Sequence, residues 1–155
     1  MSDLRTETED GIRRIILNRP EHMNSITPKM LVQLNDELKA ADDDRDIRVI
    51  LISGAGRAFC AGLDLKQAAA GEGIGGALSG GGGATHFSTR ELCTVTLQRI
   101  DTPVIAVING AAAGYGLDLA LGCDMRLMSD RAVLAPGFAK MGVVPRHADG
   151  VRAQA

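Results

Sequence analysis

Aromatic residues are scarce in this chain of 155 residues, which has no tryptophan, one tyrosine and three phenylalanines. Proteins that bind single-stranded nucleic acid stack the bases on exposed aromatic side chains, and this chain has too few of them for such a surface. The formal net charge is -2, so the basic surface that attracts nucleic acids and acidic membranes is missing as well. We therefore expect neither a nucleic-acid partner nor a membrane partner.

Long apolar runs and paired cysteines are also absent from the sequence. No run reaches the roughly 18 residues that span a bilayer, and the polar, acidic beginning (MSDLRTETEDG) is unlike a secretory signal or a transit peptide. The three cysteines, Cys60, Cys93 and Cys123, are far apart and show no metal-binding spacing. They suit reduced thiols, so we expect a cytoplasmic protein with no metal site.

Glycine is abundant, with 19 residues, and two apolar runs are each followed by small residues. The first stretch is Pro103–Leu121 (PVIAVINGAAAGYGLDLAL), whose β-branched run predicts a strand buried on both faces. Its residues from Tyr115 onward are expected to form a short helix. The second stretch, Val49–Lys66, has the run VILIS, then small residues and a segment that favours a helix.

A glycine-rich turn between a buried strand and a helix leaves main-chain N–H groups free at the start of the helix. Two such turns on neighbouring strands can each direct one N–H at the same point, and a donor of this kind stabilises an oxyanion by about 3 kcal/mol. The residues alone leave an alternative open, because glycine and alanine also allow a strand and a helix to pack closely.

The first part of the chain predicts a hairpin and a long helix. Asp10-Gly11 separates two strands at 4–9 and 12–17, and glycine accepts the positive φ that such a turn needs. Thr27-Pro28 is suited to begin a helix, and the apolar spacing continues to Ala41. The order strand, helix, strand then predicts a parallel crossover.

The remaining segments predict short elements and flexible stretches. We expect a solvated loop at 42–46, a mobile glycine-rich segment at 71–84, a helix within 88–99, and short strands at 125–128 and 132–134.

Two segments, AFCAGLDLK and INGAAAGYGLDLALGCDMRL, resemble the two signatures of the enoyl-CoA hydratase/isomerase (crotonase) superfamily. The segments GIRRIILNRPEHMNSIT and AVLAPGFAKMGVVP are similar to further parts of the family, so the likeness runs from about Leu4 to Pro145. It implies an α/β fold, a crotonase-like (ClpP/crotonase) core of parallel strands with flanking helices. One acyl-CoA-binding domain would then occupy 1–145, and we expect 146–155 to be a disordered tail.

The resemblance also implies which residues act. The main-chain N–H groups of Leu63 and Tyr115 would bind the oxygen of an acyl-CoA thioester, and Asp118 would serve as the acid or base. Coenzyme A would enter as part of the substrate, with no separate cofactor. The wall on the coenzyme A side would be formed by Ala61, Gly62, Leu63, Asp64, Lys66, Gly114 and Tyr115.

The chain departs from the family at two acidic positions. Hydratases of the family use a second glutamate where this chain has Phe138, and isomerases place an acid where it has Arg146. We expect an enoyl-CoA hydratase or isomerase of fatty acid metabolism. The loss of the second acid affects isomerisation less than hydration, because a single group can carry the proton in an isomerisation.

Two alternatives stay open beside this prediction. The first is a truncated, inactive chain that at most binds acyl-CoA. The second is a dinucleotide-binding domain, although Gly114-Tyr115-Gly116 lacks the third glycine of that fingerprint. Family members continue past the VVP segment into helices that cover the acyl pocket and build homotrimers or hexamers. Because this chain stops before those helices, we expect uncovered apolar faces rather than that assembly.

Overall fold

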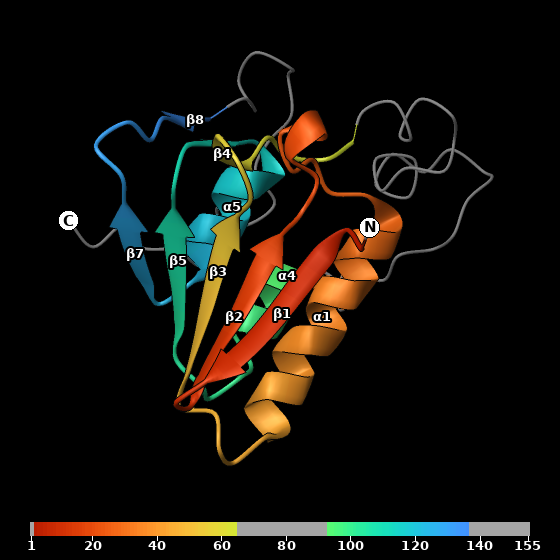
Figure 1. The fold of residues 1–155 in the computed structure, drawn as a ribbon, viewed down its shortest axis with the longest axis vertical. Coiled ribbons are helices and arrows are strands. Elements are labelled where there is room, and N and C mark those ends of the chain that lie inside the picture. Colours follow the sequence, from red (N-terminus) through yellow and green to blue (C-terminus); the bar gives the residue numbers. More distant parts are fainter. Residues whose placement is uncertain (1, 65–92, 137–155) are drawn as a thin grey trace.

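A five-stranded sheet forms the centre of the protein, whose computed structural model describes residues 2–64 and 93–136 (Figure 1). The strand order is β1-β2-β3-β5-β7. The bounds of these strands are β1 Leu4–Glu9, β2 Ile12–Leu17, β3 Val49–Gly54, β5 Val104–Ile108 and β7 Met125–Met128. The fold class expected from the resemblance is confirmed, since a mainly parallel sheet packs against helices.

The predicted hairpin is confirmed, with β1 and β2 pairing antiparallel from Leu4↔Leu17 to Glu9↔Ile12. Its turn residues Asp10 and Gly11 both have positive φ, 51° and 78°. All other neighbours in the sheet pair in parallel, so β2, β3, β5 and β7 end at the same edge. This edge lies at the top of Figure 1.

The α-helices of the described residues lie on one face of the sheet, behind it in Figure 1. They are α1 Pro28–Asp43, α4 Cys93–Leu97 and α5 Tyr115–Gly122, and a short 3-10 helix, η1 Pro20–His22, follows β2. The start of α1 is the predicted one, because the Thr27 hydroxyl accepts a hydrogen bond from the Met30 amide at 3.1 Å. The predicted α5 and β7 are also present, and β8 Leu134–Ala135 begins two residues later than the start of the expected strand.

The central strands are buried on one face only, so the prediction of burial on both faces is wrong. In β5, Val104, Ala106 and Ile108 are buried, whereas Ile105 and Val107 on the opposite face are only half-buried. The reason is that all the helices among the described residues cover the same face. A continuous β-branched run therefore indicated the strand correctly but not its surroundings.

The predicted solvated loop at 42–46 needs a correction at its first two residues, because α1 extends to Asp43. Asp42 still belongs to α1, and its carboxylate accepts hydrogen bonds from the amides of Asp101 and Thr102 at 3.0 and 2.8 Å. Desolvation opposes the charged form, but these bonds prevail and hold the pKa of Asp42 below its ordinary value. The end of α1 is thereby tied to the chain that enters β5.

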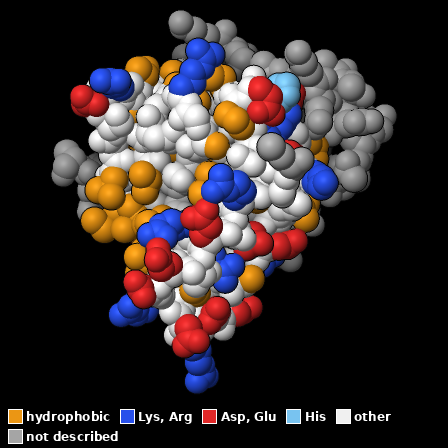
Figure 2. Space-filling model, viewed as in Figure 1, with side chains coloured by type: hydrophobic (Ala, Val, Ile, Leu, Met, Phe, Trp, Pro, Cys, Tyr) orange, Lys and Arg blue, Asp and Glu red, His pale blue; other side chains and the backbone are white. Residues whose placement is uncertain are grey.

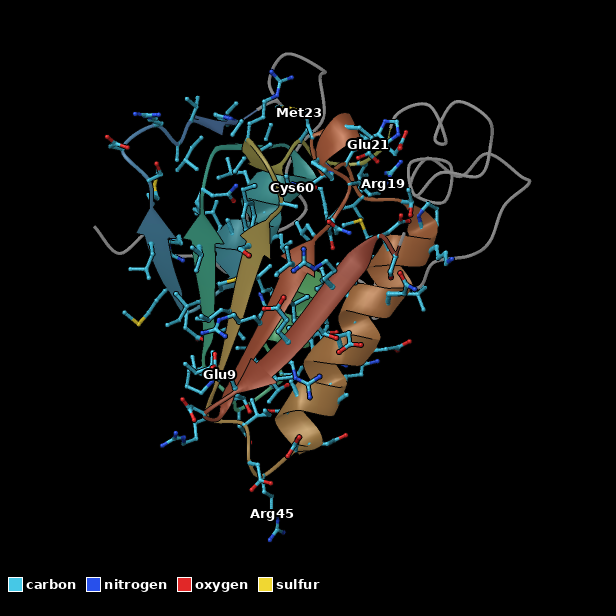
Figure 3. The ribbon with its side chains drawn as sticks, in the orientation of Figure 1. Glu9, Arg19, Glu21, Met23, Arg45 and Cys60 are labelled. Atoms are coloured by element: carbon cyan, nitrogen blue, oxygen red, sulfur yellow. The ribbon has the colours of Figure 1, made fainter. Side chains whose placement is uncertain are left out.

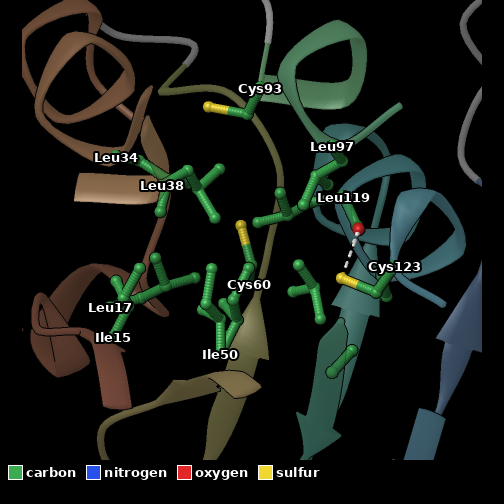
Figure 4. Close-up of a cluster of buried hydrophobic side chains, with 14 of the residues drawn as sticks. Ile15, Leu17, Leu34, Leu38, Ile50, Cys60, Cys93, Leu97, Leu119 and Cys123 are labelled. Carbon is green, nitrogen blue, oxygen red and sulfur yellow. Dashed lines mark hydrogen bonds between the residues drawn. The ribbon is translucent and has the colours of Figure 1, made fainter. Parts of the chain in front are cut away.

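The core lies between the sheet and the helices, and it contains all three cysteines (Figure 4). Burial raises the pKa of each thiol to about 12, and the Cys123 thiol donates to the Leu119 carbonyl at 3.3 Å. The side chains labelled around them are Ile15, Leu17, Leu34, Leu38, Ile50, Leu97 and Leu119. Among the described residues, no helix is both long and apolar enough to cross a bilayer.

Apolar side chains are exposed along β7, which is one edge of the sheet (Figure 2). Met125, Leu127 and Met128 are 57%, 56% and 49% exposed. The opposite edge, β1, carries charged side chains instead, with ion pairs such as Arg5–Glu7 at 2.8 Å. Charged side chains protect an edge strand from pairing with another chain, and β7 has only Arg126 for that purpose.

The bare β7 edge predicts self-association of this chain. We expect Leu127→Lys to lower the association constant by at least about tenfold in sedimentation velocity, since a charge opposes strand pairing and apolar contact. Val32→Lys on α1 is the matched control, because Val32 is similarly exposed at 45% and lies on another element. An equal effect of both substitutions would contradict a role for β7.

The buried thiols predict a loss of stability in alkaline solution. A thiol titrates near 9.0 when exposed and near 12 in the folded chain, so between these values the unfolded chain binds fewer protons than the folded one. The free energy of unfolding therefore falls as pH rises from about 9 to about 12. Urea unfolding at several pH values across this range measures the free energy of unfolding. A free energy that does not change with pH would contradict the prediction. At pH 8 a thiol reagent should label the protein only after unfolding.

Candidate functional site

A second, three-stranded sheet brings the two predicted turns together. Its strands are β4 Ala58–Cys60, β6 Ala111–Ala113 and β8, and they pair in parallel in the order β4-β6-β8. Because parallel strands end at the same edge, the segments that follow β4 and β6 leave the sheet side by side. A Cβ placed on Gly62 would lie only 3.4 Å from the Tyr115 amide nitrogen.

Two glycines allow this close approach of main chain to main chain. Gly62 has φ +105°, and a Cβ at this position would lie 3.0 Å from the Ala113 carbonyl oxygen. Gly116, in the first turn of α5, faces Cys60, and a Cβ there would overlap the Cys60 carbonyl. Any side chain at either position would push the two segments apart.

The amides of Leu63 and Tyr115 are both without a hydrogen-bond partner among residues 2–64 and 93–136. Their neighbours are bonded, since the amides of Asp64 and Leu117 donate to Ile26 and Gly114 at 3.0 and 2.9 Å. Tyr115 is the first residue of α5, where main-chain N–H groups have no carbonyl within the helix. The two amides predicted from the sequence therefore lie on adjacent segments, and neither donates a hydrogen bond to another described residue.

The side chain of Tyr115 is partly buried and packs against the core. Its hydroxyl is buried beside the Cys93 thiol, without a hydrogen bond of standard geometry in the part of the chain that the structure describes. Burial raises the pKa of the Tyr115 hydroxyl well above its ordinary value, and the nearby Cys93 thiol and Asp118 carboxylate act in the same direction. The bulk of Tyr115 therefore fills space between α5 and α4.

Asp118 lies one turn after Tyr115 on α5 and is half-buried. Its amide donates to the Gly114 carbonyl at 3.1 Å, so the first turn of the helix is closed directly behind the Tyr115 amide. Asp118 and the two amides that have no partner among the described residues therefore all lie near the first turn of α5.

Asp64 follows Leu63 and makes a largely buried ion pair with Arg19. The guanidinium Nη1 of Arg19 lies 3.0 Å from Asp64 Oδ2, and the two side chains are 11% and 12% exposed. Arg19, Met23 and Cys60 lie at the same end of the sheet, and Glu9 and Arg45 lie at the other (Figure 3). The pair links the loop after β2 to the segment that carries the Leu63 amide.

The other predicted residues have mixed outcomes. Ala61 is exposed and its amide donates to the Met23 carbonyl at 2.9 Å, while Gly114 lies beside Gly62. Lys66, Phe138 and Arg146 lie outside the described residues, as do the segments 71–84 and 146–155 and residues 88–92 of the helix expected within 88–99. The described part of that expected helix contains α4 Cys93–Leu97.

The sequence reasoning missed the small sheet and the side chains that brace the site. Asn109 accepts a hydrogen bond from the Gly54 amide at 3.1 Å and donates to the Gly56 carbonyl at 2.9 Å, so it joins the ends of β3 and β5. Buried Asn24 donates to the carbonyls of Ala55 and Ala58 at 2.9 and 2.8 Å. A strand of three residues such as β4 is too short to show an alternating apolar pattern, so no sequence signal could have revealed the small sheet. Asn24 and Asn109 lie within the segments that resemble the family, and that resemblance is the signal that could have found them.

Comparison with known proteins gives a family match over nearly the whole chain. The family model described as enoyl-CoA hydratase/isomerase matches residues 7–152. Among curated proteins, the chain is 37% identical to 1,2-epoxyphenylacetyl-CoA isomerase of Escherichia coli K12, covering 94% of this chain and 54% of that protein. It is 40% identical to carnitinyl-CoA dehydratase of Proteus mirabilis HI4320, covering 92% and 51%.

Solved structures agree with this match. An enoyl-CoA hydratase subunit I from Geobacillus kaustophilus HTA426 superposes with a TM-score of 0.77 at 29% identity, covering 93% of this chain and 52% of that one. An enoyl-CoA hydratase/isomerase from Xanthobacter autotrophicus Py2 gives 0.74 at 31% identity, covering 91% and 51%. The chain spans about half the length of the relatives that it matches.

The buried Tyr115 hydroxyl, which has no hydrogen bond of standard geometry within residues 2–64 and 93–136, predicts the effect of Tyr115→Phe. A buried polar group without a partner costs about 1–3 kcal/mol, so its removal should leave the free energy of unfolding unchanged or raise it by about 1 kcal/mol. Urea unfolding measures the change, and the substitution keeps the main-chain amide. A loss of more than about 1 kcal/mol would contradict this and would mean that the contact of the hydroxyl with the Cys93 thiol is a stabilising hydrogen bond.

Proposed function

The chain belongs to the enoyl-CoA hydratase/isomerase family, and from this premise we propose that it binds an acyl-CoA thioester at the shared edge of β4 and β6. In this proposal the amides of Leu63 and Tyr115 donate hydrogen bonds to the thioester oxygen. The observation that carries it is the adjacency of two turns whose amides have no partner among the described residues. The names of the relatives support a thioester ligand, because both curated relatives act on CoA derivatives.

Two fixed main-chain donors suit a reaction that passes through an enolate. When a proton leaves the carbon next to the thioester carbonyl, negative charge moves onto the carbonyl oxygen. Donors that already point at this oxygen stabilise the charge without reorganising, by about 3 kcal/mol each. The Tyr115 amide adds the positive end of the α5 dipole, since it is the first residue of that helix.

Asp118 is the acid or base of the proposed reaction. Its carboxylate removes a proton from the α carbon of a β,γ-unsaturated acyl-CoA, and the electron pair moves onto the thioester oxygen. The same carboxyl group then returns the proton to the γ carbon, which leaves an α,β-unsaturated product and no net change in atoms. One acid suffices for this isomerisation, whereas hydration needs a second group to handle a water.

The remaining parts of the site follow from the same proposal. Ala61, Gly62 and Gly114 form the main-chain wall beside the thioester, and Lys66 would contact a phosphate of coenzyme A. Coenzyme A enters as part of the substrate. The three buried free thiols suit a reducing compartment, so we propose a cytoplasmic location.

The proposal predicts that Asp118→Asn abolishes most of the isomerase activity. Losing a general acid or base lowers kcat by about 100- to 10,000-fold, while acyl-CoA binding should persist because the main-chain donors remain. Turnover of a short β,γ-unsaturated acyl-CoA is followed by the absorbance of the conjugated product. Asp130→Asn, an exposed carboxylate after β7, is the control and should keep full activity.

The outcomes separate the proposed enzyme from its alternative. If the wild-type chain binds acyl-CoA but turns over neither a β,γ- nor an α,β-unsaturated thioester, the inactive acyl-CoA-binding alternative is the correct one. If it fails to bind acyl-CoA in calorimetry, the thioester site itself is wrong.

A further inference from the structure

The segment Gly62–Asp64 is held in place by one isolated strand pairing. The Ile26 amide donates to the Gly62 carbonyl at 2.7 Å, and the Asp64 amide donates to the Ile26 carbonyl at 3.0 Å. In a parallel bridge of this kind, the two flanking residues make the bonds and the residue between them turns its own N–H to the other side. Leu63 is that middle residue, so the pairing with Ile26 sets the direction of its amide.

Arg19 joins the two sides of this pairing through a single nitrogen. Its Nη1 donates to the Ser25 carbonyl at 2.6 Å and to Asp64 Oδ2 at 3.0 Å. Ser25 directly precedes Ile26, and Asp64 directly follows Leu63. The guanidinium therefore ties together the two chain segments beside the bridge, where both charged side chains are almost buried.

The position of Arg19 is itself fixed by a buried asparagine. The Arg19 amide donates to Asn24 Oδ1 at 2.9 Å, and the Asn24 amide nitrogen donates to the carbonyls of Ala55 and Ala58. Asn24 is fully buried and has φ 55°. The loop after β2 is thereby anchored to the turn between β3 and β4, which leads to the Leu63 amide.

We propose that Arg19 is a positioning residue for the oxyanion site: by binding Asp64 and Ser25 it holds the Ile26–Leu63 pairing and directs the Leu63 amide at the thioester oxygen. This inference rests on the proposed function. It gives Asp64 a task different from contact with coenzyme A, because its carboxylate binds the guanidinium. A lysine cannot replace Arg19 here, since its side chain is one atom shorter and its ammonium does not reach the position of Nη1 between Asp64 and the Ser25 carbonyl.

The experiment compares Arg19→Lys with Arg13→Lys in the full chain. Arg13 is the matched control, because it makes an ion pair of its own with Glu37 at 3.3 Å between β2 and α1, away from the site. The probe is butyryl-CoA labelled with carbon-13 at the thioester carbonyl, and free coenzyme A is the second ligand. Infrared spectroscopy reports how strongly the bound carbonyl is polarised by hydrogen bonds.

We expect Arg19→Lys to lose at least about half of the carbonyl frequency shift and about tenfold in kcat, which is part of the roughly 100- to 1,000-fold that complete removal of one oxyanion donor costs. Free coenzyme A should still bind within about twofold of the wild-type Kd, since its contacts are not altered. Arg13→Lys should change none of these quantities. Asp64→Asn removes the charge of the carboxylate but keeps its shape, and it should reproduce the effect of Arg19→Lys. If Arg19→Lys does not fold, Asp64→Asn tests the same ion pair.

Hydrogen exchange tests the same inference without a ligand. The amides of Ile26 and Asp64 should exchange about tenfold faster in Arg19→Lys and Asp64→Asn but not in Arg13→Lys, because only the first two open the pairing. Unchanged exchange and an unchanged carbonyl shift in both variants would overturn the role of Arg19 while acyl-CoA binding stands. If the wild-type chain shows no carbonyl shift at all, the proposed function fails, and the intact exchange pattern distinguishes that result.

Discussion

The parallel pairing of β4 with β6 is the constraint on which the site depends. It brings together two chain segments that are far apart in sequence, and it makes both of them end at the same edge. The pairing is possible because Gly62 and Gly116 carry no side chain where each faces main chain of the other segment. Every other feature of the site is arranged around these two strand ends.

Side-chain hydrogen bonds connect the five-stranded sheet to the segments that carry the β4–β6 pairing. Asn109, at the end of β5, bonds to the main chain at the end of β3 and in the turn that leads to β4. Asn24 bonds to the same turn from the opposite side. The side chains of Asn24 and Asn109 therefore bind main-chain groups in the turn between the two sheets, which the strand pairings do not use. Buried main-chain groups of a turn need such partners.

The interaction of charge with main-chain dipoles connects this geometry to the proposed chemistry. Main-chain amides are donors that neither titrate nor rotate, so their value depends only on where the chain directs them. Tyr115 shows this separation clearly, because its amide belongs to the proposed site while its side chain packs against the core. A residue with an unusual side chain can therefore keep the donor, although it changes the space beside it.

The outer face and the β7 edge show what the described fold leaves uncovered. The half-buried Ile105 and Val107 and the exposed Met125 and Leu127 lie on strands of the central sheet. The matched relatives are about twice as long as this chain.

The sequence by itself determined the local elements, because turn residues, caps and apolar spacing act over a few neighbours. The Asp10-Gly11 hairpin, the Thr27 cap, the helix from Tyr115 and the family signatures could all be identified in this way. Only the tertiary structure decided that β4 and β6 pair, that Arg19 binds Asp64, and that one face of the sheet is covered. These depend on contacts between distant residues and on strands too short to show a period, which no local pattern records.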